Sequence, residues 1–361
     1  MAWSLLIRNG TVVDGSGGPA RAADVALEGE RIAAVGPGLS GEAARVIDAT
    51  GLMVAPGFID AHSHSDLVYD KCPSAESKVR QGVTTEVVGM CSFSPAPVAP
   101  GRAGLVQEWA GGIGGKIPIT WNSFGEYLDH LRGLGPTVNI AQFVGHGALR
   151  LAAVGPDARP VTPDEQRGME RLLAEALDAG AFGFSTGLVY APSVYGSTDE
   201  LVSLARSMAT RRGLYFSHIR GEAATLEQAA EEAIRIGELG GVPVQIAHVK
   251  ASGRENWPKI TIVTGIPIGP PSQSPDPKSA CMWSPVPIAA TTRPESAATG
   301  SLSTRWFQGL DAGKTGQAGA PGTLPACATA TPTASRARKR TAILVTEAEM
   351  PLRPESCPPG G

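Results

Sequence analysis

The chain has few cysteines, few aromatic residues and no long hydrophobic run. Its five cysteines stand at irregular positions (72, 91, 281, 327 and 357), which is not the spacing of a disulfide framework and favours a reducing, cytoplasmic setting. Every apolar stretch is interrupted by glycine, proline or charge before it is long enough to cross a membrane. The first residues lack the basic and apolar regions of a signal peptide. We therefore expect a cytoplasmic protein that is not embedded in a membrane.

The chain also lacks a large excess of positive or negative charge. The formal net charge is −3 and hydrophobic residues make up 42% of the chain, which gives no bias toward nucleic acids or membrane surfaces. A length of 361 residues exceeds one average domain but suits a barrel with a small accessory domain. Composition gives no indication of the oligomeric state.

Residues 259–361 differ in character from the rest of the chain. They hold 15 of the 30 prolines and none of the six histidines. Stretches rich in Pro, Ala, Thr and Gly cannot bury enough apolar surface to become ordered, so we expect this tail to be largely disordered. Two explanations stay open: a natural Pro-rich tail, or a frameshift or truncation that has replaced the true C-terminal sequence.

Residues 1–53 predict a small antiparallel β-domain. The apolar segments around Asn9-Gly10 have the pattern of two strands joined by a hairpin turn. The segments on either side of Glu28-Gly29-Glu30 repeat this pattern.

Residues 54–258 alternate between strand and helix patterns. Six apolar strand candidates end near His62, Cys91, His146, Tyr190, His218 and His248. Between strands, Thr162-Pro163-Asp164-Glu165 is a capping box that opens a helix closed by Gly180, and Thr225 begins another in the same way. The alternation indicates a parallel sheet covered by helices and favours an incomplete, TIM-like (β/α)₈ barrel of about six strands. An open doubly wound sheet is the alternative, although it would concentrate polar residues at one switch point.

Candidate metal ligands follow several of these strands. His62 and His64 are two apart and would leave an extended strand on the same side, with Asp66 behind them. Paired histidines are often ordinary surface residues, but a buried-strand pattern precedes this pair. Imidazole and carboxylate groups suit a borderline-soft divalent ion such as zinc.

Three further candidates are Cys91, His218 and His248. Each alone is more often a small buried hydrophobic residue or a hydrogen-bonded core histidine than a ligand. Together with His62 and His64 they occupy the ends of predicted strands 1, 2, 5 and 6. Because catalytic groups of a barrel gather where its strands end, we predict a metal site there.

These segments resemble the amidohydrolase superfamily, and more closely its N-acyl-D-amino-acid deacylase (D-aminoacylase) family. The resemblance runs from Leu5 to about Ile260 and is carried by Pro-Gly-Phe-Ile-Asp-Ala-His-Ser-His-Ser-Asp and five other motifs. The six motifs are residues 6–15, 56–66, 81–89, 185–190, 217–222 and 245–257. The resemblance implies a metal-dependent hydrolase barrel.

The resemblance also implies a ligand scheme. Hydantoinase- and dihydroorotase-like relatives, the cyclic-amide alternative, bridge two metals with a carboxylated lysine at the end of strand 4, and residues 184–190 contain no lysine. In the deacylases a strand-2 cysteine bridges instead, which matches Cys91. One tight zinc would then be bound by Cys91, His218 and His248, with His62 and His64 at a weaker second position. Met90 and Ser92 depart from the Asn and Gly usual beside this cysteine.

The implied reaction is hydrolysis of an N-acyl-D-amino acid to a D-amino acid and a carboxylate. By resemblance, Lys250 and Tyr190 would bind the substrate carboxylate, with Arg220 a weaker candidate, although Lys250 also fits a solvated loop lysine. The family's catalytic aspartate ends strand 8, and neither Asp276 nor Asp311 ends an apolar strand run. No catalytic residue is therefore assigned, and we expect poor hydrolysis. The alternative is a non-catalytic zinc-binding fragment whose first and sixth strands have exposed edges.

Overall fold

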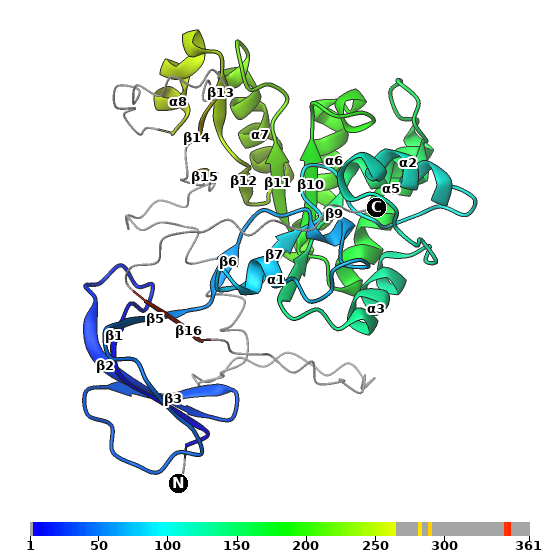
Figure 1. Cartoon of the computed structure of the whole chain (residues 1–361). Coiled ribbons are helices and arrows are strands. Elements are labelled where there is room, and N and C mark those ends of the chain that lie inside the picture. Colours follow the sequence, from blue (N-terminus) through cyan, green and yellow to red (C-terminus); the bar gives the residue numbers. More distant parts are fainter. Residues whose placement is uncertain (1–2, 265–280, 284–287, 291–342, 348–361) are drawn as a thin grey trace, which may run out of the picture. The chain divides into compact units, whose positions relative to one another are not determined.

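The structure, a computed structural model, describes residues 3–264, 281–283, 288–290 and 343–347 (Figure 1). The chain divides into two compact units. The first comprises Met1–Ile59, Glu76–Thr85 and Thr331–Gly361, and the second comprises Asp60–Ala75 and Glu86–Ala330. All five candidate metal ligands belong to the second unit, and the predicted boundary at residue 53 stays a prediction.

The described elements alternate in the order strand, then helix, through most of the second unit. The strands are β1 (Leu5–Val12), β2 (Arg21–Glu28), β3 (Arg31–Gly36), β4 (Val46–Asp48), β5 (Leu52–Pro56), β6 (Phe58–Asp60), β7 (Val83–Val88), β8 (Asn139–Gln142), β9 (Val144–Gly145), β10 (Gly183–Gly187), β11 (Leu214–His218), β12 (Val244–Ile246), β13 (Lys250–Ser252), β14 (Cys281–Trp283), β15 (Ile288–Ala290) and β16 (Ile343–Glu347). The α-helices are α1 (Glu76–Val79), α2 (Ala103–Gly114), α3 (Phe124–Leu134), α4 (His146–Ala153), α5 (Pro163–Ala179), α6 (Thr198–Met208), α7 (Leu226–Gly240) and α8 (Trp257–Thr264).

The predicted hairpin turn at Asn9-Gly10 is wrong. Strand β1 continues through both residues, and its register with β2 shifts between Ile7 and Gly10, which marks a β-bulge. Asn9 has a left-handed backbone (φ 62°), its amide donates to Asp24, and a Cβ at Gly10 would lie 2.5 Å from a methyl group of Val54. A left-handed Asn followed by Gly therefore serves a bulge here as readily as a turn.

The first sheet is mixed rather than wholly antiparallel. Strands β1, β2 and β3 pair antiparallel, as predicted, with Gly29 in the turn between β2 and β3. Strands β4 and β5, however, both pair parallel with β1, and β16 pairs antiparallel with β5. Only the sequential hairpin was visible in the sequence, because pairing between distant segments leaves no local pattern.

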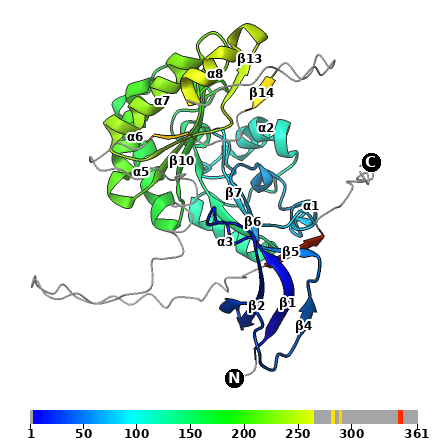
Figure 2. The same ribbon diagram turned by 90° about the vertical axis from the view of Figure 1, so that its left-hand side faces the viewer.

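The second unit contains the predicted parallel sheet. Strands β9, β10, β11 and β12 pair parallel in sequential order, and helices α5, α6 and α7 lie side by side along this sheet (Figure 2). The third predicted strand is divided into β8 and β9 at Phe143, whose amide donates to Val88 on β7 at 2.9 Å. Strands β6, β7 and β8 form a three-stranded sheet in that order. The parallel arrangement is thus confirmed for β9 to β12, and the number of strands in a closed barrel stays a prediction.

Helix ends follow the local sequence closely in one case and loosely in another. Thr162 and Glu165 form the predicted capping box at the start of α5, and Gly180 closes that helix in a left-handed conformation. Thr225 precedes α7, but its side chain makes no capping hydrogen bond. The helix instead buries a row of small and aliphatic residues, so packing rather than capping stabilises it.

The predicted tail begins within an ordered element. Helix α8 runs to Thr264, past the expected boundary at 258, and β14 and β15 pair antiparallel with β13 and β12. The edge of the sixth strand, β12, is therefore paired, contrary to the expectation of an exposed edge. Most of 259–361 lies outside the described residues, where the expectation of disorder stays untested. Among the described helices, none combines the length and apolarity that a membrane crossing requires.

Candidate metal centre

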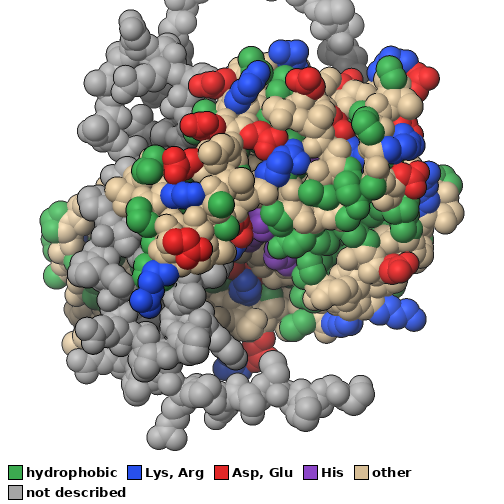
Figure 3. All heavy atoms as spheres, turned by 90° about the horizontal axis from the view of Figure 1, so that it is seen from above, with side chains coloured by type: hydrophobic (Ala, Val, Ile, Leu, Met, Phe, Trp, Pro, Cys, Tyr) green, Lys and Arg blue, Asp and Glu red, His purple; other side chains and the backbone are tan. Residues whose placement is uncertain are grey.

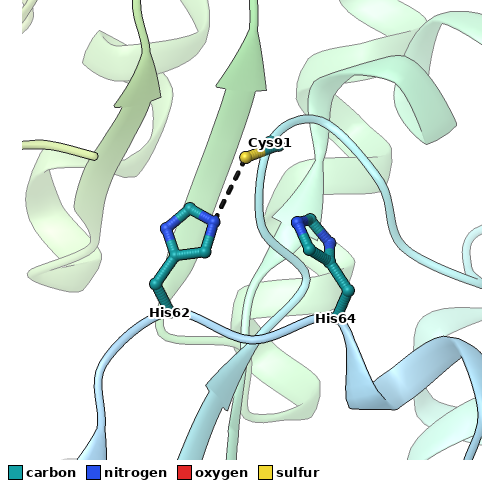
Figure 4. A group of neighbouring side chains, drawn as sticks. All are labelled: His62, His64 and Cys91. Carbon is teal, nitrogen blue, oxygen red and sulfur yellow. Dashed lines mark hydrogen bonds between the residues drawn. The ribbon is translucent and has the colours of Figure 1, made fainter. Parts of the chain in front are cut away.

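His62 and His64 lie in the segment that follows β6, not in the strand itself. Strand β6 ends at Asp60, and the amide of Ser63 donates to the carbonyl of Val87 at 2.9 Å, which holds the segment against β7. The two imidazole ring centroids are 5.4 Å apart. The strand geometry predicted for the pair is wrong, but the turn brings both rings to the same side (Figure 4).

Cys91 lies in the turn after β7, where Gly89, Cys91 and Ser92 all have left-handed backbones. A Cβ at Gly89 would lie 2.0 Å from the carbonyl oxygen of Phe143, so only glycine fits there. The Cys91 Sγ lies 3.2 Å from His62 Nε2 (Figure 4). The same atom lies 3.4 Å from His248 Nε2.

Ser92, one of the departures from the deacylase pattern, has its own partners. Its buried hydroxyl accepts from the Gly147 amide at 2.7 Å, and its amide donates to Ser185 Oγ at 3.1 Å. The hydroxyl thus ties the Cys91 turn to the start of α4, which explains how a serine is accommodated at this position.

His218 and His248 approach the same cysteine from the parallel sheet. His218 is the last residue of β11, and His248 follows β12 with a left-handed backbone (φ 29°). Their ring centroids lie 4.3 Å apart at 85°. The ligand atoms of Cys91, His218 and His248 all lie within 4.8 Å of one another, and so do those of His62, His64 and Cys91. The predicted residues are thus brought together as two groups that share Cys91.

Burial shifts the pKa of His62, His64, Cys91 and His218. It is the main cause that lowers the pKa of His62 and His218 to about 3, and it lowers that of His64 as well. It raises the pKa of the Cys91 thiol to about 12. Neutral imidazoles offer lone pairs to a cation, whereas a buried thiol becomes a thiolate only when a positive charge compensates it. A divalent ion would supply that charge.

Unpaired ring nitrogens give a second indication of a cation. Within the described part of the chain, His62 Nδ1, His64 Nδ1 and His218 Nδ1 are buried without a hydrogen-bond partner. Buried polar atoms usually have partners. Seen from outside, histidine side chains lie within a hollow beside a patch of hydrophobic side chains (Figure 3). The donor set, one sulfur and four imidazoles, fits a borderline-soft divalent ion such as zinc.

Asp66 and His146 are not part of this cluster. Asp66 is buried, accepts from Gln142 at 3.1 Å, and has a pKa raised to about 7, mainly by burial. His146, at the end of the third predicted strand, bonds through one ring nitrogen to Ser193 and through the other to Glu200, at 2.7 and 2.8 Å. Both residues serve the packing around the site. Asp276 and Asp311 lie outside the described residues.

Two of the three predicted substrate-binding residues lie beside the metal cluster. Lys250, on β13, has its Nζ 3.2 Å from His248 Nδ1. Tyr190 follows β10, is 40% exposed, and places its ring edge-on to His218 with centroids 5.1 Å apart. On its other side it contacts the ring of Phe93 at 5.4 Å. Both polar groups therefore border the space in front of the histidines.

Arg220, the third predicted substrate-binding residue, is engaged with protein acceptors. Its guanidinium donates to both carboxylate oxygens of Glu232, at 2.9 and 3.0 Å, and to the carbonyls of Val194 and Gly196, at 3.0 and 2.9 Å. These bonds orient its donors toward the segment after Tyr190. Four of its five N–H donors are thus engaged with protein acceptors, and its part in substrate binding stays a prediction.

Glu222 is the functional candidate that the sequence reasoning missed. Its Oε1 lies 3.3 Å from His218 Nε2 and 3.3 Å from His248 Nδ1, and it also accepts from Lys250. The Lys250 ammonium and both histidines help to lower the pKa of Glu222 to about 2 against the opposing effect of burial. One feature of the sequence could have indicated Glu222. It lies four residues after His218, in the loop that follows a strand predicted to carry a metal ligand.

Comparison with known proteins identifies relatives of this chain. The chain is 44% identical over 256 residues to an N-acyl-D-glutamate deacylase of Alcaligenes xylosoxydans xylosoxydans, covering 71% of this chain and 51% of that protein. It is 41% identical over 261 residues to a D-aminoacylase of the same organism, covering 71% and 52%. The chain thus spans about half the length of the curated relatives it matches.

A solved structure shows the same fold. The crystal structure of an N-acyl-D-glutamate deacylase from Bordetella bronchiseptica, complexed with zinc and a phosphonate inhibitor, superposes with a TM-score of 0.67 at 39% identity. The match covers 73% of this chain and 55% of that one. In addition, residues 45–348 match the sequence model of the amidohydrolase family. On this match, which spans most of its length, the chain belongs to the amidohydrolase family.

Proposed function

We propose that this chain is a zinc-dependent amide hydrolase that converts an N-acyl-D-amino acid and water to a D-amino acid and a carboxylate. The observation that carries the proposal is the pair of ligand groups that share Cys91. Similarity to an N-acyl-D-glutamate deacylase, a D-aminoacylase and an N-acyl-D-aspartate deacylase supports the substrate class.

The tight zinc would be bound by Cys91, His218 and His248, and His62 and His64 would serve a weaker second position. The first group is the more buried of the two, and burial excludes the water that competes for a cation. When bound, zinc supplies Lewis acidity toward an acyl carbonyl and toward a water molecule.

The chain's own polar groups would orient the substrate. Lys250 offers an ammonium and Tyr190 a hydroxyl on the same side of the histidine cluster, and an α-carboxylate needs such a cation and such a donor. Tyr190 is 40% exposed, whereas the Lys250 side chain is 17% exposed. The substrate carboxylate would therefore lie toward the exposed Tyr190, and the acyl carbonyl would lie toward the metal ligands.

The test is release of D-amino acid from an N-acetyl-D-amino acid by zinc-loaded protein, with the L-enantiomer and Cys91→Ala as controls. We expect slow release that is selective for the D-enantiomer and is abolished in Cys91→Ala. Release equal in wild type and Cys91→Ala would overturn the hydrolase proposal and leave a zinc-binding protein without this activity.

A further inference from the structure

The start of helix α4 is bonded to the turn that carries Cys91. The Gly145 amide donates to Ser94 Oγ at 2.9 Å. The Gly147 amide donates to Ser92 Oγ at 2.7 Å. A Cβ at Gly145 would lie 1.9 Å from the carbonyl oxygen of Ser92, so only glycine allows this close approach of the two backbones. The first turn of α4 is therefore held against the turn of a proposed metal ligand.

His146, between these two glycines, bonds the segment that follows Tyr190. Its Nδ1 lies 2.7 Å from Ser193 Oγ, and its Nε2 lies 2.8 Å from Glu200 Oε1. Burial lowers the pKa of His146, which keeps the ring neutral. The Glu200 carboxylate is paired with Arg150 and can only accept, so the ring proton resides on Nε2. The Ser193 hydroxyl then donates to Nδ1.

Ser193 is closely connected to Tyr190. It lies three residues further along the chain, and the amide of Val194 donates to the Tyr190 carbonyl at 2.8 Å. A Cβ at Gly196 would lie 2.8 Å from His146 Cε1, so the imidazole ring also packs directly against the end of this segment. Ser193 and His146 are both fully buried. The serine is therefore not accessible as a nucleophile, and its bond to the ring serves to place the segment.

We propose that His146 is a positioning residue that sets the place of Tyr190 relative to Cys91, and rests for its consequence on the proposed function, in which Tyr190 binds the substrate carboxylate. Both chain neighbours of His146 are bonded to the Cys91 turn, and its side chain is bonded to the Tyr190 segment. One short, buried link thus fixes the spacing between a metal ligand and a carboxylate donor. Because such a link orders the site before the substrate arrives, its loss should weaken substrate binding and leave zinc binding intact.

The first experiment uses Ser193→Ala, which removes the donor to His146 and leaves the ring in place. Calorimetry gives the Kd of N-acetyl-D-glutamate for the zinc-loaded full chain, and competition with a chelator gives the Kd of zinc. We expect the Kd of N-acetyl-D-glutamate to rise about 3- to 10-fold, because binding must then order the segment without one hydrogen bond. We expect the Kd of zinc to stay unchanged.

Ser203→Ala is the matched control, because the Ser203 hydroxyl also donates one hydrogen bond, to Glu170 at 2.6 Å, but does so between α6 and α5. It should leave both Kd values unchanged. An unchanged Kd of N-acetyl-D-glutamate in Ser193→Ala overturns the inference. An equal rise in Ser203→Ala, or a parallel loss of zinc affinity in Ser193→Ala, does so as well.

The second experiment replaces each ring nitrogen of His146 by an amide. In His146→Asn the amide reaches the position of Nδ1 and can accept from Ser193, whereas in His146→Gln it reaches the position of Nε2 and can donate to Glu200. We expect the amide hydrogens of residues 190–195 to exchange at nearly the wild-type rate in His146→Asn. They should exchange faster in His146→Gln and in Ser193→Ala.

The opposite order of the two His146 variants, or wild-type exchange in Ser193→Ala, overturns the inference. Hydrogen exchange requires no substrate. Wild type that fails to bind N-acetyl-D-glutamate would therefore count against the proposed function, while the exchange rates would still support or overturn the positioning role of His146.

Discussion

At the scale of single residues, Cys91 has a special place because it belongs to both ligand groups. Two imidazole nitrogens lie within 3.4 Å of its sulfur, and binding of the proposed zinc as a thiolate would explain why a thiol, which is often only a small buried hydrophobic group, stands there. Replacing it should therefore affect both positions, whereas replacing a histidine should affect one.

We expect Cys91→Ala to lose most of its zinc after purification and dialysis, since neither group keeps three ligands. Elemental analysis of matched samples measures this. Zinc content equal to that of wild type would remove Cys91 from the site.

The weaker position gives a complementary prediction. His64 belongs only to the group formed with His62 and Cys91, so His64→Asn should keep the tight zinc and lose the zinc that binds at higher concentration. Calorimetric titration separates the two steps. Loss of the tight step in this variant would contradict the assignment of the tight site to His218 and His248.

At the scale of elements, the segment between β10 and α6 is held by the side chains of Arg220, Trp109 and His146. Arg220 holds the carbonyls of Val194 and Gly196, Trp109 donates to the carbonyl of Ala191 at 2.9 Å, and His146 bonds Ser193. All of these anchors act on the residues that follow Tyr190. They restrict the position of its ring beside the histidines.

Removing the Arg220 anchor should loosen that segment. In Arg220→Gln, we expect amide hydrogens of residues 190–197 to exchange faster than in wild type, because two carbonyls lose a charged donor. Hydrogen-exchange mass spectrometry measures the effect, and Arg235→Gln on the exposed face of α7 is the control. Equal protection in both variants would show that Arg220 does not hold the segment.

The buried ion pair between Glu200 and Arg150 should contribute to the free energy of unfolding. Glu200 bonds both Arg150 and His146, and its side chain is 2% exposed while that of Arg150 is 0% exposed. Glu200→Gln leaves a buried guanidinium without its counter-ion, which typically costs about 3–5 kcal/mol of unfolding free energy.

Urea denaturation checks this prediction against Glu76→Gln, which removes an exposed pair with Arg80 expected to contribute about 0–1 kcal/mol. Similar small losses in the two variants would show that the buried network is not a stabilising element.

At the scale of the whole molecule, the proposed metal links folding to function. A cation that binds only the folded state stabilises it by mass action, by about 2.7 kcal/mol at a hundred times its Kd. We expect zinc to raise the urea midpoint of wild type and to leave that of Cys91→Ala unchanged. An equal rise in both would indicate zinc binding elsewhere on the chain.

Much of the second unit was predictable because its signals are local. The capping box at Thr162 with Gly180 at the helix end and the apolar strands before His218 and His248 are short patterns that the structure reproduces. The prediction of a hairpin turn at Asn9-Gly10 was wrong because it, too, relied on a local signal alone. A left-handed Asn-Gly pair is compatible with a turn or a bulge, and only the packing of Val54 against Gly10 decides between them.

The sequence by itself determined the five candidate metal ligands, because ligand types and strand ends can be read along the chain. The tertiary structure alone decided how those residues are used. It turned Arg220 toward the carbonyls after Tyr190, kept His146 in a buried network, and placed Glu222 between two histidines from different strands. Such roles depend on distances between segments far apart in the chain, and no local pattern encodes those distances.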